Sequence, residues 1–131
     1  MSQSELNRFA IRYAAAWSGG NPDDLASLYA NAGSLSVNAG TPSVGRTAIA
    51  ATAGEFMAAF PDMVVKMDSV SREGDHAKFH WTWTGTNTGP GGTGNPVRIS
   101  GYEEWKFSAD GLILVSKGHF DEAEYQRQMG R

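Results

Sequence analysis

Apolar and polar side chains alternate most regularly in the last third of the chain, over residues 97–121. From Val97 to Phe107 the apolar residues fall on odd positions and most polar residues on even ones. This spacing predicts a strand with one packed face. A turn is expected at 109–111, followed by a second strand over 112–121 and a helix that closes the chain. The pattern therefore predicts a β-hairpin that leads into a terminal helix.

Ionisable side chains interrupt the apolar positions of these two strands. Glu103 shares the parity of Trp105 in the first strand, and His119 and Asp121 share the parity of Ile113 in the second. A carboxylate on an apolar face must be paired, hydrogen-bonded or protonated, because an isolated charge there is costly. Glu103, His119 and Asp121 are therefore the candidate catalytic residues.

The rest of the chain predicts helices first and strands afterwards. Ser2 and Glu5 are spaced as a capping box, Asn21 as an N-cap, and Thr47 as the cap of a third helix. The expected elements are helices over 6–17, 21–29, 47–60 and 121–129, and strands over 34–37, 63–72, 76–87, 97–107 and 112–121. This order predicts an α+β fold, a curved antiparallel sheet with helices on one face, which can close a cone whose mouth is a pocket.

Composition narrows the functional classes. The 131 residues fit a single domain, 1–131, and the net charge of −3 without Lys/Arg clusters argues against a nucleic-acid partner. The absence of cysteine excludes disulfides and thiolate chemistry. No segment approaches the ~20 apolar residues of a membrane span. We expect a soluble, cytoplasmic protein.

Two motifs that suggest cofactors or metals are better explained structurally. The Gly89-x-Gly91-x-x-Gly94 run precedes a predicted strand, whereas a dinucleotide fingerprint must open a helix. His76 and His80 lie four residues apart on a strand, a separation of ~13 Å that is too long for one metal ion. We expect no metal and no cofactor.

Each candidate residue also has a structural interpretation. Asp121 precedes the last helix with Glu124 three residues later, which is the layout of an N-cap. Glu103 could pair with a Lys or Arg across the sheet or a dimer interface. Tyr13 lies on the core stripe of the first helix, where its hydroxyl needs a partner or faces a cavity. The four Trp residues suit core and pocket lining.

Motifs spread along the chain follow one known pattern. Residues 13–30 look like paired opening helices, 45–49 like a Gly-x-x-x-Ile helix start, and 60–62 read Phe-Pro-Asp. Residues 83–94 are similar to a Gly-Thr-His-x-Gly loop, and 118–130 carry an Asp followed by Arg-Gln-Met-Gly. Over nearly its whole length the chain thus resembles the SnoaL-like polyketide cyclases of the NTF2-like, ketosteroid-isomerase-like superfamily.

The resemblance implies an NTF2-like cone, also called a cystatin-like α+β barrel, with about three N-terminal helices and a short C-terminal one. In the cyclases an Asp at the position of Asp121 is the acid/base of an intramolecular aldol closure. Asn87 stands where the family's loop usually has His. Tyr13 and Glu103 match the oxyanion-binding pair of ketosteroid isomerase, but that enzyme's base position falls near residues 37–38, where no side chain can abstract a proton.

The resulting hypothesis is a cofactor-free enzyme acting on a small apolar or polyketide-like carbonyl compound. Asp121 would move the proton, with His119 and Glu103 tuning it, and Tyr13 or Asn87 would hydrogen-bond the enolate. The substrate-binding set is Tyr13, Trp17, Asn87 and Trp105. The alternatives are a non-catalytic ligand-binding or dimerising module and a ketosteroid isomerase-like activity. The resemblance also implies a homodimer.

Overall fold

The computed structural model describes residues 1–131 as four helices and six strands. The helices are α1 (Gln3–Ser18), α2 (Pro22–Ala26), α3 (Arg46–Ala59) and α4 (Glu122–Met129). The strands are β1 (Tyr29–Val37), β2 (Ser43–Val44), β3 (Val64–Glu73), β4 (His76–Thr86), β5 (Pro96–Phe107) and β6 (Ile113–His119).

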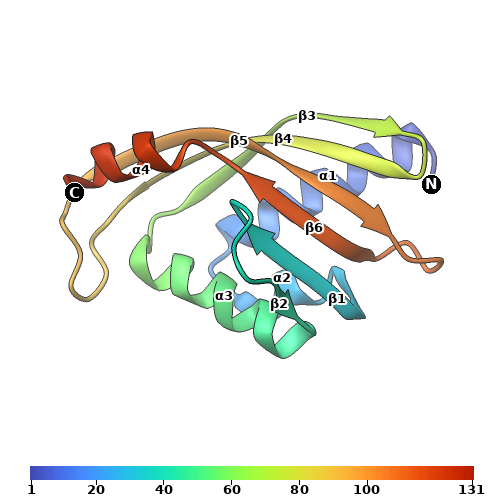
Figure 1. Cartoon of the computed structure of the whole chain (residues 1–131), viewed down its shortest axis with the longest axis horizontal. Coiled ribbons are helices and arrows are strands. Elements are labelled where there is room, and N and C mark those ends of the chain that lie inside the picture. Colours follow the sequence, from blue (N-terminus) through green and yellow to red (C-terminus); the bar gives the residue numbers. More distant parts are fainter.

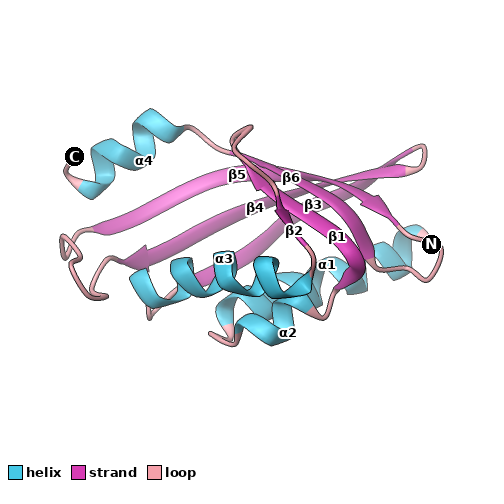
Figure 2. Cartoon of the chain, turned by 60° about the horizontal axis from the view of Figure 1, so that its bottom comes forward, coloured by secondary structure: helices cyan, strands magenta, loops and turns pink.

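One curved sheet in the order β2-β1-β6-β5-β4-β3 carries the fold. α1, α2 and α3 cover one face of it, and α4 lies at the end of the sheet beside β5 (Figures 1 and 2). The predicted α+β class and helix arrangement are confirmed. Two details differ: β1 pairs with β6 in parallel, so the sheet is not wholly antiparallel, and the sheet remains open rather than closing into a barrel.

The caps predicted from the sequence are present at the starts of α1 and α2 but not at the start of α3. The capping box of Ser2 and Glu5 is present in α1, and the Asn21 side chain accepts a hydrogen bond at the start of α2. The prediction for Thr47 is wrong, because α3 begins at Arg46 after Gly45, which has a φ of 89° and no side-chain cap. α2 is also shorter than expected, since Tyr29 already belongs to β1.

Aromatic side chains pack α1 onto the centre of the sheet. The rings of Phe79 and Trp105 stack with centroids 4.7 Å apart, and Tyr13 meets Trp105 edge-on at 4.9 Å. These rings come from β4, β5 and α1, and all three side chains are fully buried. The packing fixes the Tyr13 hydroxyl against β5, where Glu103 lies.

An irregularity in β6 changes which side chains face the core. Lys106 pairs with Val115 and Phe107 with Ile113, so Leu114 has no partner on β5. Such a bulge inserts one residue and reverses the alternation beyond it. Ser116 therefore joins the buried face after Ile113. The single parity predicted over 112–121 is wrong from this point onward.

Candidate functional site

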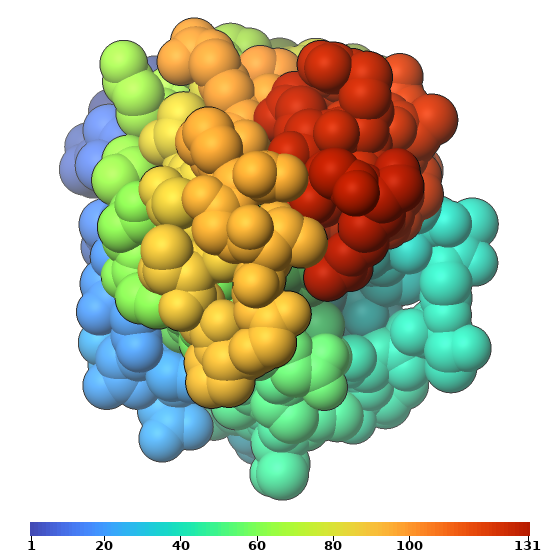
Figure 3. Space-filling view, turned by 90° about the vertical axis from the view of Figure 1, so that its left-hand side faces the viewer, coloured from blue at the N-terminus to red at the C-terminus, as the bar shows by residue number.

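The candidate site is an apolar pocket between the sheet and the helices α1 and α3. Its volume is about 70 Å³. Figure 3, which views the end of the molecule that carries α4, shows a recess where α4, α3 and the segment around β2 approach one another. The lining is almost entirely apolar and largely aromatic: Trp17, Leu35, Val37, Phe56, Met63, Val65, Trp81, Trp83, Glu103, Gly118 and Phe120.

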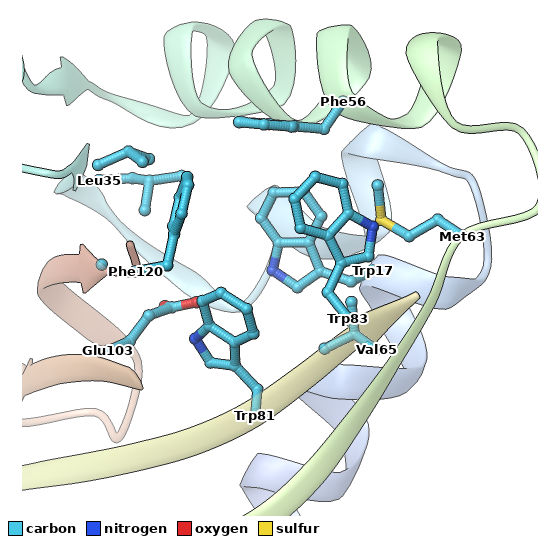
Figure 4. Close-up of a pocket in the computed structure, with 11 residues that line it drawn as sticks. Trp17, Leu35, Phe56, Met63, Val65, Trp81, Trp83, Glu103 and Phe120 are labelled. Carbon is cyan, nitrogen blue, oxygen red and sulfur yellow. The ribbon is translucent and has the colours of Figure 1, made fainter. Parts of the chain in front are cut away.

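Glu103 is the one ionisable side chain in this lining (Figure 4). Its side chain is buried, with 7% of the residue exposed, and one oxygen receives three hydrogen bonds. Ser116 Oγ donates to Glu103 Oε1 over 2.6 Å and Trp105 Nε1 over 2.9 Å. The Tyr13 hydroxyl donates to the same oxygen over 2.8 Å. Neutral donors from three elements thus hold one side of the carboxyl.

The other oxygen of Glu103 has no partner within the protein. All three hydrogen bonds to the carboxyl end at Oε1. Oε2 accepts none, yet it is not fully buried, so it is open to the pocket. Glu103 also forms no salt bridge. The predicted Lys or Arg partner across the sheet is therefore not found. Within the carboxyl, Oε1 is held by three hydrogen bonds and Oε2 is free.

Burial controls the protonation of this cluster. Desolvation raises the pKa of the Glu103 carboxyl above its ordinary value of 4.5, although the hydrogen bonds from Ser116, Trp105 and Tyr13 act in the opposite direction. Burial, followed by the nearby charge of Glu103, raises the pKa of the Tyr13 hydroxyl well above 10.0. Tyr13 also hydrogen-bonds the Tyr29 hydroxyl over 2.7 Å. Both tyrosines are therefore neutral, and Glu103 is the group that can change charge.

Two indole groups of the pocket have unused hydrogen-bond donors. Nε1 of Trp81 and Nε1 of Trp83 are buried and have no partner in the protein. Figure 4 shows the Trp81 indole nitrogen on the side of the ring that faces Glu103. Buried donors are nearly always paired, so these two are available to a ligand that displaces the side chains around them.

His119 lies on the opposite face of the sheet from the pocket. Its ring stacks on Tyr102 at 4.7 Å, and its Nε2 lies 2.8 Å from Glu104 Oε1. Both neighbours are on the outer face of β5, because even positions of β5 point away from the helices. The prediction that strand parity directs His119 into the pocket is wrong, and the bulge at Leu114 is the reason.

Asp121 is an exposed N-cap and does not line the pocket. Its Oδ1 accepts a hydrogen bond from the backbone N–H of Glu124 over 3.0 Å, at the start of α4. This is the capping geometry expected from sequence. The structure does not bring Asp121 together with Glu103. Phe120, one residue earlier, is the side chain of this segment that lines the pocket.

The predicted substrate-binding residues separate into three groups. Trp17 lines the pocket as expected. Tyr13 and Trp105 do not line it, and act on it through their hydrogen bonds to Glu103. Asn87 is buried in the loop before β5, where its side chain bonds the Ala59 carbonyl and the backbone N–H of Thr93. Asn87 therefore shapes the loop and is not placed to touch a ligand.

Ser116 is a site residue that the sequence did not indicate. It is completely buried and makes the shortest hydrogen bond to Glu103, 2.6 Å. Uniform alternation along the strand places Ser116 on the outer face, and Leu114 carries no glycine or proline signal for a bulge. No feature of the sequence could have identified it.

The structure contains no group of three or more His, Asp or Glu side chains that could hold a metal ion. His76 is exposed and pairs with the neighbouring Asp75 at 2.7 Å, while His80 contacts Tyr102 on the outer face. None of the four helices is long and apolar enough to span a bilayer.

Comparison with known proteins identifies the family. The sequence profile described as the SnoaL-like domain matches residues 10–115, which is most of the chain. The chain belongs to the SnoaL-like family. A comparison with curated protein sequences gives no match. Membership therefore rests on the family profile, and solved structures add information on the fold.

Several solved structures resemble this SnoaL-like chain. One, from Catenulispora acidiphila, has a ketosteroid isomerase-like fold and contains trimethylamine (23% identity, 93% of this chain and 92% of that chain covered, TM-score 0.82). AclR from Streptomyces galilaeus is described as a hydroxylase (20% identity, 98% of this chain and 87% of that chain covered, TM-score 0.80). A protein from Jannaschia sp. CCS1 is described as a SnoaL-like polyketide cyclase (15% identity, 97% of this chain and 92% of that chain covered, TM-score 0.83). These likenesses show that the SnoaL-like chain has the ketosteroid isomerase-like, or NTF2-like, fold.

Proposed function

We propose that this SnoaL-like protein is a cofactor-free enzyme that transfers a proton on a small, largely apolar, carbonyl-bearing substrate, with Glu103 as its acid/base. The observation that carries the proposal is the Glu103 carboxyl, buried in the pocket with one oxygen anchored and the other free. Burial raises its pKa, which brings a carboxyl closer to the value at which it both accepts and donates a proton. Membership of the SnoaL-like family supports a small-molecule enzyme.

A single carboxyl is sufficient for this chemistry. The ionised Glu103 would take a proton from the carbon next to a carbonyl through Oε2, leaving an enolate and a neutral carboxyl. The same oxygen would return the proton to the enolate, at the same or a conjugated carbon, so that atoms and charge balance. The indole N–H groups of Trp81 and Trp83 are unpaired but covered, so they would donate to the enolate oxygen only once the side chains around them move aside. This assignment moves the proton carrier from Asp121 to Glu103.

Pocket size sets the scale of the substrate. A volume of about 70 Å³ is about half of the roughly 150 Å³ of an engineered apolar cavity that binds benzene. A ligand of a few heavy atoms, or one substituent of a larger molecule, fits without moving the aromatic walls. The fused rings of a steroid exceed this volume, and neither Val37 nor Asn38 supplies a base where ketosteroid isomerase has one, so ketosteroid isomerisation is disfavoured.

The test is deuterium exchange at the carbons next to the carbonyl of acetone and butanone in heavy water, followed by NMR. We expect the wild-type protein to accelerate exchange and Glu103→Gln to lower that acceleration by about 10²-fold or more. Asp121→Asn is the matched control and should exchange like wild type. The assignment is wrong if Asp121→Asn abolishes exchange while Glu103→Gln retains it.

The second candidate is a binding module without chemistry. It is favoured by the position of Asp121, which caps α4 outside the pocket, and by the presence of only one ionisable group in the lining. The Catenulispora acidiphila protein, which shares this fold, was obtained with trimethylamine, so the fold can hold a small ligand. Binding of small ligands without any acceleration of exchange would support this candidate over the enzyme.

A further inference from the structure

We propose that the pocket binds small alkylated ammonium ions, with the ionised Glu103 as counter-ion and the aromatic walls as the cage for the alkyl groups. This inference goes beyond the proton transfer proposed above and does not depend on it. An ammonium ligand requires only the carboxylate, the aromatic rings and the space between them, whether or not the site performs a reaction.

The first observation is the absence of a cation for a buried acid. Glu103 has no Lys, Arg or His partner, and no basic side chain lines the pocket. The groups that face its carboxyl are neutral: Tyr13 from α1, Ser116 from β6 and Trp105 from its own strand. Behind Tyr13 lies the Tyr29 hydroxyl, which is also neutral and is hydrogen-bonded to the Tyr13 hydroxyl. The negative charge of an ionised Glu103 therefore has no positive partner in the protein, and a bound cation would supply one.

The second observation is the composition of the walls. Five aromatic side chains line the same space as Glu103: Trp17, Phe56, Trp81, Trp83 and Phe120. In Figure 4, Phe56 and Phe120 are seen edge-on, so that their faces are turned toward the space between the labelled residues. The faces of aromatic rings attract cations, and cages of this kind recognise alkylated ammonium groups. A strongly hydrated primary ammonium ion is a poorer fit, because the pocket has a single oxygen to replace its water.

Size and shape favour a compact ion. A pocket of about 70 Å³ has room for a compact group, such as one nitrogen carrying three methyl groups, and not for the whole of a polycyclic amine. Such an ion presents methyl groups to the rings and directs its single N–H to Glu103 Oε2, the oxygen that the protein leaves free. The geometry thus points to trimethylammonium-like ligands.

The experiment is an NMR titration of the indole N–H signals of Trp81 and Trp83 in the full chain. The probes are trimethylammonium chloride, tert-butanol as a compact neutral control and acetate as an anion with the same number of heavy atoms as trimethylammonium. We expect trimethylammonium to bind at least about tenfold more tightly than either control. We also expect its affinity to rise as the pH is raised through the titration of Glu103, because only the ionised carboxyl attracts the cation.

Two variants complete the test. Glu103→Gln should remove the preference for the cation over tert-butanol. Phe56→Leu keeps an apolar wall but removes one aromatic face, and should weaken trimethylammonium binding several-fold while leaving tert-butanol binding unchanged. Equal binding of trimethylammonium and tert-butanol, a preference that survives in Glu103→Gln, or no binding to the wild type would each overturn the inference. The readout is independent of turnover, so its failure is distinguishable from failure of the proton-transfer proposal.

Discussion

The two oxygens of Glu103 have different roles because the donors around the carboxyl are placed unevenly. Oε1 accepts bonds from Ser116, Trp105 and Tyr13, which fix the plane of the group, and Oε2 is left for the pocket. Hydrogen bonds to a carboxylate favour its ionised form, whereas burial favours the neutral form. Burial is the larger effect here, so the pKa of Glu103 is raised. Each of the three donors reduces the size of that increase.

Ser116→Ala should raise the pKa of Glu103 further. The Ser116 hydroxyl is the strongest of the three influences that lower this pKa, and alanine removes it without adding bulk. The measurement is the carboxyl titration of Glu103 by NMR in wild type and variant. Ser100→Ala is the matched control, because Ser100 bonds Thr82 and not Glu103. An unchanged or lower pKa in Ser116→Ala would contradict the assigned role.

The stability of Glu103→Gln relative to wild type should depend on pH. A carboxyl whose pKa is raised on folding stabilises the native state fully below its unfolded pKa, near 4.5, and loses that contribution as the pH rises through its folded pKa. Glutamine does not titrate. The difference in melting temperature, variant minus wild type, should therefore increase with pH across this window. A constant difference, or one that decreases with pH, would show that Glu103 is not buried as an acid.

At the scale of elements, the sequence predicted one strand of the site correctly and the other incorrectly. β5 alternates without interruption through Glu103, so period-2 reasoning placed this residue on the packed face, as observed. In β6 the unpaired Leu114 reverses the alternation, which sends His119 outward and Ser116 inward. A bulge depends on the register with the neighbouring strands, and neither Leu114 nor its neighbours encode that register locally.

α4 depends on Asp121 for its start. Asp121→Ala removes the acceptor for the Glu124 N–H and should cost about 1 kcal/mol of unfolding free energy, while Asp121→Asn, which keeps an N-cap side chain, should cost only a few tenths. Chemical denaturation of the two variants and wild type measures this. A loss in Asp121→Asn as large as in Asp121→Ala would mean that the charge, and not the cap, is what the protein requires.

At the scale of the whole molecule, the two faces of the sheet carry different groups of side chains. The face under α1 and α3 holds the pocket, and the outer face carries a half-buried cluster of His80, Tyr102 and His119, with Lys78 over the Tyr102 ring at 4.9 Å. The helices that cover the inner face were predictable from their periodicity and caps. The pocket volume was not, because it depends on how side chains from β1, α3, β4 and β6 meet in three dimensions.

The homodimer expected from the sequence stays a prediction, and the outer-face cluster is the surface on which we expect it to form. Aromatic side chains are enriched at such interfaces, and Tyr102 is at the centre of this cluster. Sedimentation analysis should give a dimer for wild type and a larger monomer fraction for Tyr102→Ser. His76→Ser, on the hairpin outside the cluster, is the control. A wild-type protein that sediments as a monomer would exclude this arrangement.

The central claim is that Glu103 is the buried, proton-carrying group of the pocket, and its pKa tests this claim most directly. The carboxyl titration can be followed by NMR on labelled protein, with Glu103→Gln to assign the signal. The structure predicts a midpoint above 4.5, because burial outweighs the three hydrogen bonds to Oε1. A midpoint at or below 4.5 would contradict the account, since the carboxyl would then be held ionised by its donors and could not return a proton to a substrate.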